Sequence, residues 1–230
     1  MYRLMESTCD ADAATDCAEW LLALLETRRW EQERIRFFVS GGKSPAAVFD
    51  LLAASHFPWR NVDLLLVDER WAPEQPQDQN ATLVQKHLLQ QHAATSHFQP
   101  LLLDTDFSRN LIACNEAVSA IRQPDIVLLG MGLDGHTASL FPDAEDFASA
   151  MKTTDRYVAV HPASAPYPRI SMSFSWLVSA RQIVLFIPGR DKRDVFNGIV
   201  KNKQSTSPIR PLAQQADTRL TVITTRKRSS

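Results

Sequence analysis

Residues 124–137 read PDIVLLGMGLDGHT, and this stretch decides the fold of the chain. Its apolar run at residues 126–129 is typical of a parallel strand that is buried on both faces. Three glycines follow, and a glycine allows backbone angles and close contacts that a side chain forbids. The next residues, 137–141 (TASLF), are predicted to begin a helix. Because ligands of open α/β sheets bind beyond the carboxyl ends of the strands, this turn is a predicted ligand site.

Further strand patterns alternate with helix patterns along the chain. Strands are predicted at residues 35–39, 62–67, 126–129, 157–160, 170–174, 183–187 and 220–224. Helices are predicted from a cap at Asp12 or Thr15 to near Arg29, from Pro45 to about residue 54, and over residues 80–91, 108–121 and 189–200. The alternation indicates an α/β fold with a mostly parallel central sheet and helices on both faces, a Rossmann-like three-layer sandwich. Because no repeat, linker or shift of composition divides the chain, residues 1–230 are predicted to form one domain.

The composition argues against several classes of function. The near balance of 25 Lys and Arg against 26 Asp and Glu argues against a general polyanion binder, because duplex-binding proteins normally show a clustered basic face. The only concentrated basic run, residues 226–228, is expected to be a solvated tail. No apolar stretch reaches the ~18 residues that span a bilayer, and no signal-peptide core follows Met1. Cys9, Cys17 and Cys114 have no CxxC spacing and are expected to be reduced thiols. We therefore expect a cytoplasmic protein without a nucleic-acid or membrane partner.

Residues 40–45 (SGGKSP) stand between a predicted strand and a predicted helix, where they can form an anion cradle. Gly41 and Gly42 expose backbone N–H groups, and the start of a helix adds a partial positive charge. Ser44 can donate its hydroxyl, and Lys43 brings a full charge. The stretch is neither a Walker loop nor a GxGxxG motif, so no nucleotide is indicated. A tight turn without a ligand is the alternative interpretation.

Charged residues mark other strand ends. Asp68, Glu69 and Arg70 directly follow a predicted strand, so these charges are expected to face solvent or to pair with one another. Arg70 is a candidate phosphate ligand because its planar fork matches phosphate oxygens; a surface Asp–Arg pair is the alternative. Lys192, at the start of a predicted helix, can reach a ligand anion, and Arg169, just before a predicted strand, is a similar candidate.

His136 is the candidate general base, because an unperturbed imidazole titrates near ~6.5. Asp134 can orient it or raise its basicity. The remaining histidines are interpreted as structural: His56, His87, His92, His97 and His161. None of the histidines has the HxxxH or HExxH spacing of a metal site. Ser139 and Cys114 lack the strand–elbow context of a nucleophile. The cradle, the Arg, the His and the Lys are all predicted to meet at one edge of one sheet.

These motifs resemble those of the 6-phosphogluconolactonases, in the same order and over roughly residues 35–225. The matching pieces are SGGxSP (40–45), DER (68–70), GMGxDGHTASLFP (130–142), RISMS (169–173) and GxxK (189–192). The long GMG block is highly specific, whereas SGG and DER alone are not.

The resemblance implies an α/β sandwich related to glucosamine-6-phosphate deaminases. It further implies metal-independent, cofactor-free hydrolysis of the 1,5-lactone of 6-phosphogluconate in the pentose phosphate pathway. His136 would be the base that activates water, with Asp134 beside it. The residues implied in substrate or phosphate binding are Gly41, Gly42, Ser44, Asp68, Arg70, Arg169 and Lys192. The chain departs from the family at Lys43, where a small hydroxyl residue is usual, and in residues 161–168, which lack a Lys often found there.

Two other functions remain possible. An isomerase or deaminase of the same superfamily, acting on glucosamine 6-phosphate, needs a carboxylate soon after the His, as in GHIAFNEP. Residues 138–142 (ASLFP) offer none before Asp143, and such enzymes tend to have Tyr where Arg70 stands. A non-catalytic sugar-phosphate sensor would need no base and would usually carry a DNA-binding or partner module. The expected partner is a small sugar-phosphate lactone, bound by a monomer or a weak homo-oligomer.

Overall fold

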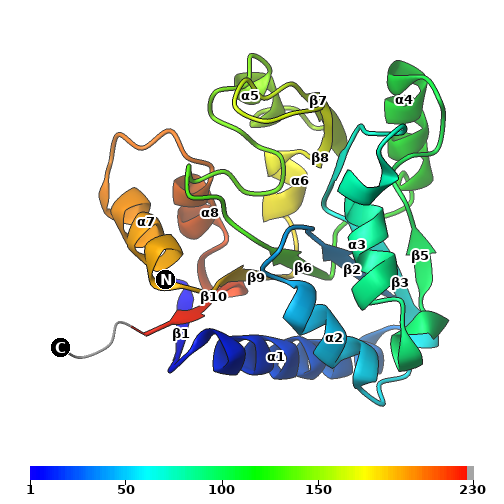
Figure 1. Ribbon diagram of the computed structural model, residues 1–230, viewed down its shortest axis with the longest axis vertical. Coiled ribbons are helices and arrows are strands. Elements are labelled where there is room, and N and C mark those ends of the chain that lie inside the picture. Colours follow the sequence, from blue (N-terminus) through cyan, green and yellow to red (C-terminus); the bar gives the residue numbers. More distant parts are fainter. Residues whose placement is uncertain (227–230) are drawn as a thin grey trace.

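A seven-stranded sheet forms the centre of the computed structural model, which describes residues 1–226 (Figure 1). Its strands are β1 (Arg3–Ser7), β2 (Ile35–Val39), β3 (Val62–Leu66), β5 (His97–Gln99), β6 (Ile126–Leu129), β9 (Gln182–Ile187) and β10 (Leu220–Thr225). They lie in the order β1-β10-β9-β6-β2-β3-β5, and every neighbouring pair is parallel. The predicted α/β class and parallel central sheet are confirmed. Lys227 and Arg228 of the basic run lie outside the described residues.

Helices lie on both sides of this sheet, with α1 and α2 on one side and α6 and α8 on the other (Figure 1). Their bounds are α1 (Asp10–Glu31), α2 (Ala46–Ala54), α3 (Asn80–His87), α4 (Phe107–Ala117), α5 (Phe147–Ala150), α6 (Phe174–Val178), α7 (Arg190–Lys201) and α8 (Ile209–Gln215). Short 3₁₀ turns occupy residues 59–61, 76–78, 91–95 and 217–219. Among residues 1–226, no helix is both long and apolar enough to pass through a bilayer.

The first helix begins earlier than its sequence indicates. Cys9 is the N-cap, and its Sγ accepts a hydrogen bond from the backbone N–H of Asp12 at 3.4 Å. The predicted cap at Asp12 or Thr15 is therefore wrong. Cysteine is not among the preferred capping residues, so no sequence rule points to it.

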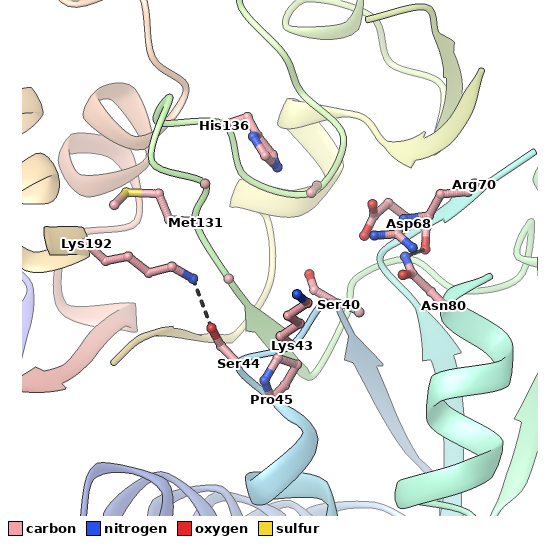
Figure 2. Close-up of a pocket in the computed structure, with 15 residues that line it drawn as sticks. Ser40, Lys43, Ser44, Pro45, Asp68, Arg70, Asn80, Met131, His136 and Lys192 are labelled. Atoms are coloured by element: carbon pink, nitrogen blue, oxygen red, sulfur yellow. Dashed lines mark hydrogen bonds between the residues drawn. The ribbon is translucent and has the colours of Figure 1, made fainter. Parts of the chain in front are cut away.

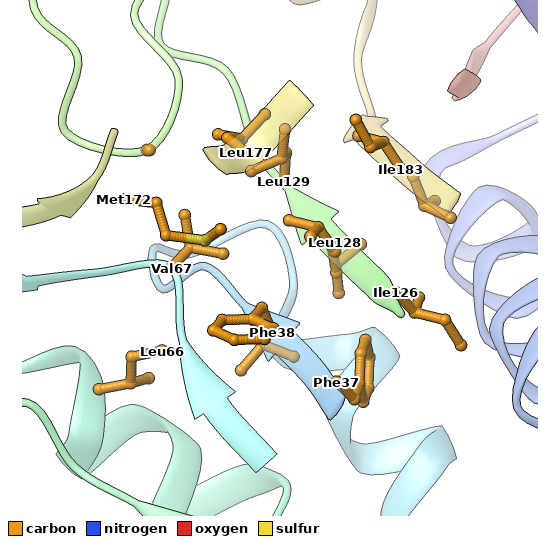
Figure 3. Close-up of a cluster of buried hydrophobic side chains, with 14 of the residues drawn as sticks. Phe37, Phe38, Leu66, Val67, Ile126, Leu128, Leu129, Met172, Leu177 and Ile183 are labelled. Atoms are coloured by element: carbon orange, nitrogen blue, oxygen red, sulfur yellow. The ribbon is translucent and has the colours of Figure 1, made fainter. Parts of the chain in front are cut away.

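Strands β2, β3 and β6 supply the middle of the core (Figure 3). All four residues of β6 are buried, as are Phe37 and Phe38 on β2, whose side chains point to opposite faces of the sheet. Because both faces are covered, the apolar residues run without the alternation of a half-exposed strand. The sheet is therefore a rigid support for the loops at its carboxyl edge.

A second, three-stranded antiparallel sheet lies beside the first. It consists of β4 (Asp68–Arg70), β8 (Arg169–Met172) and β7 (Tyr157–Val160), in the order β4-β8-β7. Val67 joins the two sheets, since its N–H donates to Val39 of β2 and its carbonyl accepts from Met172 of β8. The prediction that the cradle, Arg70, His136 and Lys192 meet at the edge of one sheet needs one correction, because Arg70 belongs to this second sheet.

The helix predicted at residues 137–141 does not form. Thr137 and Leu140 instead make an isolated antiparallel bridge around Ala138, which has a positive φ of 51°. The segment bonds to the second sheet: the Ser139 N–H donates to Ser171 Oγ at 3.1 Å, and Ser139 Oγ donates to a carboxylate of β4 at 2.6 Å. These tertiary bonds replace the hydrogen bonds that a helix would have made.

Candidate active site

One pocket at the carboxyl edge of the central sheet collects most of the predicted site residues (Figure 2). Its lining comes from the loops after β2 and β6, from β4, and from the starts of α3 and α7. The lining residues are Ser40, Gly41, Gly42, Lys43, Ser44, Pro45, Asp68, Arg70, Asn80, Gly130, Met131, Gly132, His136, Ala138 and Lys192. Of the predicted site residues, Asp134 and Arg169 do not line it.

The loop after β2 is shaped by its two glycines. Gly42 has a φ of +96°, which favours glycine. Gly41 lies so close to Asn80 that a Cβ would come within 1.9 Å of its Oδ1. The buried hydroxyl of Ser40 at the base of the pocket has no hydrogen-bond partner within the described part of the chain. A donor-rich loop with an unused hydroxyl suits a polar ligand.

Lys192 reaches this loop from α7. Its Nζ donates to Ser44 Oγ at 2.9 Å, as the dashed line in Figure 2 shows. Gly189 is the N-cap of helix α7, and its φ of +92° turns the chain after β9 into the helix. Burial lowers the pKa of Lys192, because a low-dielectric site disfavours the charged amine. An anionic ligand would offset that burial.

Asp68 and Glu69 of β4 are buried and Arg70 is half-buried, which corrects the sequence prediction that these charges face solvent or pair with one another. Glu69 is fully buried and accepts backbone N–H bonds from Arg70 at 2.7 Å, Asn80 at 2.6 Å and Ala81 at 2.8 Å. Burial raises its pKa to about 7, despite these donors. Asp68 is nearly buried and accepts from Ser139 Oγ at 2.6 Å. Backbone donors and a hydroxyl have thus replaced both water and the expected cation partners.

Arg70 and Arg169 lie opposite each other on β4 and β8. The Arg70 Nη1 donates to the carbonyl of Asp78 at 2.5 Å. Arg169 is 6 % exposed, and its Nη1 has no partner within residues 1–226. Burial, followed by the charge of Arg70, lowers the pKa of Arg169. Two adjacent guanidinium groups with a free donor favour an anion next to them.

His136 and Asp134 form a hydrogen-bonded pair in the loop after β6. Nδ1 of His136 lies 2.6 Å from Oδ1 of Asp134. Because an ionised carboxylate only accepts, this contact favours the tautomer in which Nδ1 carries the proton and the lone pair is on Nε2. Gly132 is essential to this contact, since a Cβ there would lie 2.2 Å from Asp134 Oδ1 and 2.4 Å from the imidazole. Figure 2 shows the ring directed toward the pocket.

The remaining histidines lie outside this pocket. His161 has a matching partner, with its Nδ1 2.7 Å from Asp146, and His87 lies 2.9 Å from Asp50. Within residues 1–226, no group of three or more His, Cys, Asp or Glu side chains is placed to hold a metal ion.

Two residues at the site were not among the predicted site residues, although Phe141 belongs to the GMGxDGHTASLFP block. Asn80 lines the pocket, and its Nδ2 donates to the carbonyl of Asp68 at 2.8 Å. Phe141 stacks on the ring of His136, with 4.0 Å between the ring centroids. Neither has a spacing that marks a site, because both act through contacts formed only in the folded chain.

Comparisons with known proteins agree with one another. The sequence model described as glucosamine-6-phosphate isomerases/6-phosphogluconolactonase matches residues 9–222. A 6-phosphogluconolactonase of Neisseria meningitidis serogroup A is 33% identical over 204 residues, covering 86% of this chain and 88% of the relative. Another, of Mesorhizobium japonicum, is 41% identical over 166 residues, covering 70% of each chain. A crystal structure of a 6-phosphogluconolactonase from Shewanella baltica, 28% identical, superposes with a TM-score of 0.88 over 98% of this chain and 97% of that one.

Proposed function

Since the chain belongs to the family of glucosamine-6-phosphate isomerases and 6-phosphogluconolactonases, we propose that it is a hydrolase that opens 6-phospho-D-glucono-1,5-lactone to 6-phospho-D-gluconate, a step of the pentose phosphate pathway. One observation supports this function most strongly. The His136–Asp134 pair turns a free imidazole nitrogen toward a pocket whose walls carry Arg70 and Lys192. A base and cations in one cavity are what a phosphorylated ester requires.

In the proposed reaction, Nε2 of neutral His136 takes a proton from water as the water oxygen attacks the lactone carbonyl. Asp134 stabilises the imidazolium through its bond to Nδ1. When the bond between the carbonyl carbon and the ring oxygen breaks, the imidazolium returns the proton to that oxygen. The immediate products are a hydroxyl and a carboxylic acid, which releases its remaining proton to solvent and becomes a carboxylate, and the mechanism uses no metal ion. A positioned base contributes ~10²–10⁴-fold.

The phosphate is assigned to the cationic side chains of the pocket. Figure 2 shows Lys192 and Arg70 on either side of the loop 40–45, so both flank an anion that rests on its N–H groups. Arg169 supports Arg70 from the neighbouring strand. Asp68 has an oxygen left to accept a hydroxyl of the sugar, since Ser139 bonds only Oδ2.

The geometry favours hydrolysis over isomerisation. The first carboxylate after His136 is Asp143, which is exposed and does not line the pocket. The neighbour of the imidazole is Phe141 instead. A second carboxylate next to the base, which the isomerase pattern requires, is therefore not provided by this segment.

The test is a lactone-hydrolysis assay that compares the protein, the His136→Asn variant and a reaction without protein. The last is needed because the lactone also opens spontaneously. We expect His136→Asn to lower kcat by ~10²–10⁴-fold, because asparagine cannot take the proton. Dialysis against EDTA should leave the rate unchanged.

His161→Asn is the matched control, since His161 also bonds an aspartate but lies outside the pocket. It should keep the wild-type rate. A wild-type rate no faster than the spontaneous one would overturn the proposed function, and equal losses in the two variants would remove His136 from its role.

A further inference from the structure

The imidazole of His136 is covered by an aromatic ring from the same loop. The rings of Phe141 and His136 lie 4.0 Å apart between centroids, at an interplanar angle of 22°. Phe141 is 5 % exposed, so its ring is fixed by packing. Its backbone N–H donates to Ser139 at 3.2 Å, and Ser139 is itself bonded to both β4 and β8. The segment that carries the stacked ring is thus anchored to the second sheet through Ser139.

Three neighbours confine the imidazole. Asp134 bonds Nδ1, and Gly132 closes the side of Nδ1 and Cε1, where a Cβ would come within 2.4 Å. Phe141 covers a face of the ring. None of these three neighbours bonds Nε2, and Figure 2 shows this ring directed toward the cavity. Rotation of a histidine ring about χ2 is otherwise broad, so a hydrogen bond at Nδ1 alone leaves the plane of the ring loosely defined.

We propose that Phe141 is a positioning residue for His136. It holds the plane of the imidazole so that the Nε2 lone pair points at the water next to the substrate carbonyl. This role rests on the proposed lactonase function. Phe141 does not touch the substrate, because it does not line the pocket. Its contribution therefore appears in the chemical step and not in the binding of the phosphate.

The test is the Phe141→Leu variant, which keeps an apolar side chain but removes the flat ring. We expect kcat to fall by about 10²-fold, the effect of a small misplacement of a catalytic group, while KM stays within about twofold. Phe147→Leu is the matched control, because Phe147 lies on α5, is only partly buried, and does not stack on His136. If Phe141→Leu does not fold, Phe141→Met replaces it, since methionine fills irregular space.

A double variant separates positioning from general support of the fold. In the His136→Asn background, Phe141→Leu should cause no further loss, because Phe141 acts only through the imidazole. A wild-type kcat in folded Phe141→Leu would overturn the proposal. A loss of kcat/KM that comes entirely from a higher KM would also overturn it. The same would follow if Phe141→Leu lowered activity as much in the His136→Asn background as in the wild type.

The dynamics of the histidine ring provide a readout that needs no activity. Carbon-13 relaxation of the His136 ring should show a rigid imidazole in the wild type and in Phe147→Leu, and a mobile one in Phe141→Leu. If the wild type does not hydrolyse the lactone, the proposed function fails, and this measurement still decides the role of Phe141. A ring that is equally rigid in all three proteins would overturn it.

Discussion

At Gly132 the absence of a side chain makes room for the pair of Asp134 and His136. Gly132→Ala would place a methyl group 2.2 Å from Asp134 Oδ1 and 2.4 Å from the His136 ring, so both side chains have to move. We expect kcat to fall by about 10²-fold, because the imidazole shifts relative to the substrate. A lactone-hydrolysis assay measures it.

Gly198→Ala is the control for this variant. Gly198 lies within α7, and a Cβ there meets nothing within 4 Å. This variant should keep the wild-type rate and gain a little stability, since alanine favours helices. If Gly132→Ala is as active as Gly198→Ala, the pair tolerates displacement and its close packing has no catalytic meaning.

Lys43 is a charge that this chain adds to its pocket. If the phosphate of the substrate binds in the cradle as proposed, the ammonium of Lys43 lies near it. Lys43→Ser should then raise KM about 5- to 10-fold and leave kcat unchanged, as expected for the loss of a charge pair worth about 1 kcal/mol in water. The effect should shrink at high salt. Steady-state kinetics at low and high ionic strength measure it.

Lys86→Ser is the control for Lys43, because Lys86 is exposed on α3 and does not line the pocket. An unchanged KM in Lys43→Ser, or the same rise in both variants, would show that Lys43 does not meet the phosphate.

Individual site residues were predictable where a motif combined glycines with a polar group at a strand end. The loop 40–45, Arg70 and His136 all line the pocket as predicted. Asn80 was not predictable, because its place beside Gly41 depends on how α3 packs against the loop. Phe141 looks in sequence like any core phenylalanine, and only its contact with His136 distinguishes it.

Among the elements, β4 and α3 are joined by the buried carboxylate of Glu69. The pKa of this group rises from 4.5 in water to about 7 in the folded chain, because it is buried. Between these two pH values the folded state holds a proton that the unfolded state has released. Stability therefore falls as pH rises through this window, by on the order of 3 kcal/mol in total.

Glu69→Gln removes this proton linkage. Its unfolding free energy should change less between pH 5 and pH 8 than that of the wild type, which urea denaturation at both pH values measures. At pH 5 the variant should be less stable by about 1–3 kcal/mol, because an amide NH2 that cannot accept a hydrogen bond would face the N–H of Ala81, which donates to the Glu69 carboxyl oxygen in the wild type. A wild-type protein that gains more stability than the variant between pH 5 and pH 8 would contradict the buried, protonated carboxyl.

The elements were predictable where their own side chains decide their structure. The apolar strands β2 and β6 occupy the predicted residues, and α7 differs from its prediction by one residue at each end. Residues 137–141 have helix-compatible side chains, yet the bonds of Ser139 to β4 and β8 decide their conformation. Strands were predicted close to β7 and β8, but a local sequence pattern does not determine which other strand each one pairs with.

For the whole molecule, hydrogen bonds cross between the two sheets at several points. Val67 bonds to both Val39 and Met172, and the Tyr157 hydroxyl donates to Leu66 at 2.6 Å. We therefore propose that residues 1–226 unfold as one cooperative unit, consistent with the prediction of one domain. Differential scanning calorimetry should show one transition with equal calorimetric and van't Hoff enthalpies. Two resolved transitions would mean that the small sheet is a separate unit.

At this scale the α/β class and the parallel sheet followed from the alternation of strand and helix patterns along the chain. The division into two sheets did not, because it depends on where the chain leaves the first sheet after Val67. No sequence feature marks that residue as different from the rest of its apolar strand.

The adjacent guanidinium groups of Arg70 and Arg169 affect how the protein should be handled in the laboratory. Two like charges side by side attract small anions, and binding to the folded state raises the melting temperature. Phosphate or sulfate buffers should thus protect the enzyme against heat while they compete with its substrate. Purification and assays in amine or zwitterionic buffers would avoid an inhibitor that is easily mistaken for a stabiliser.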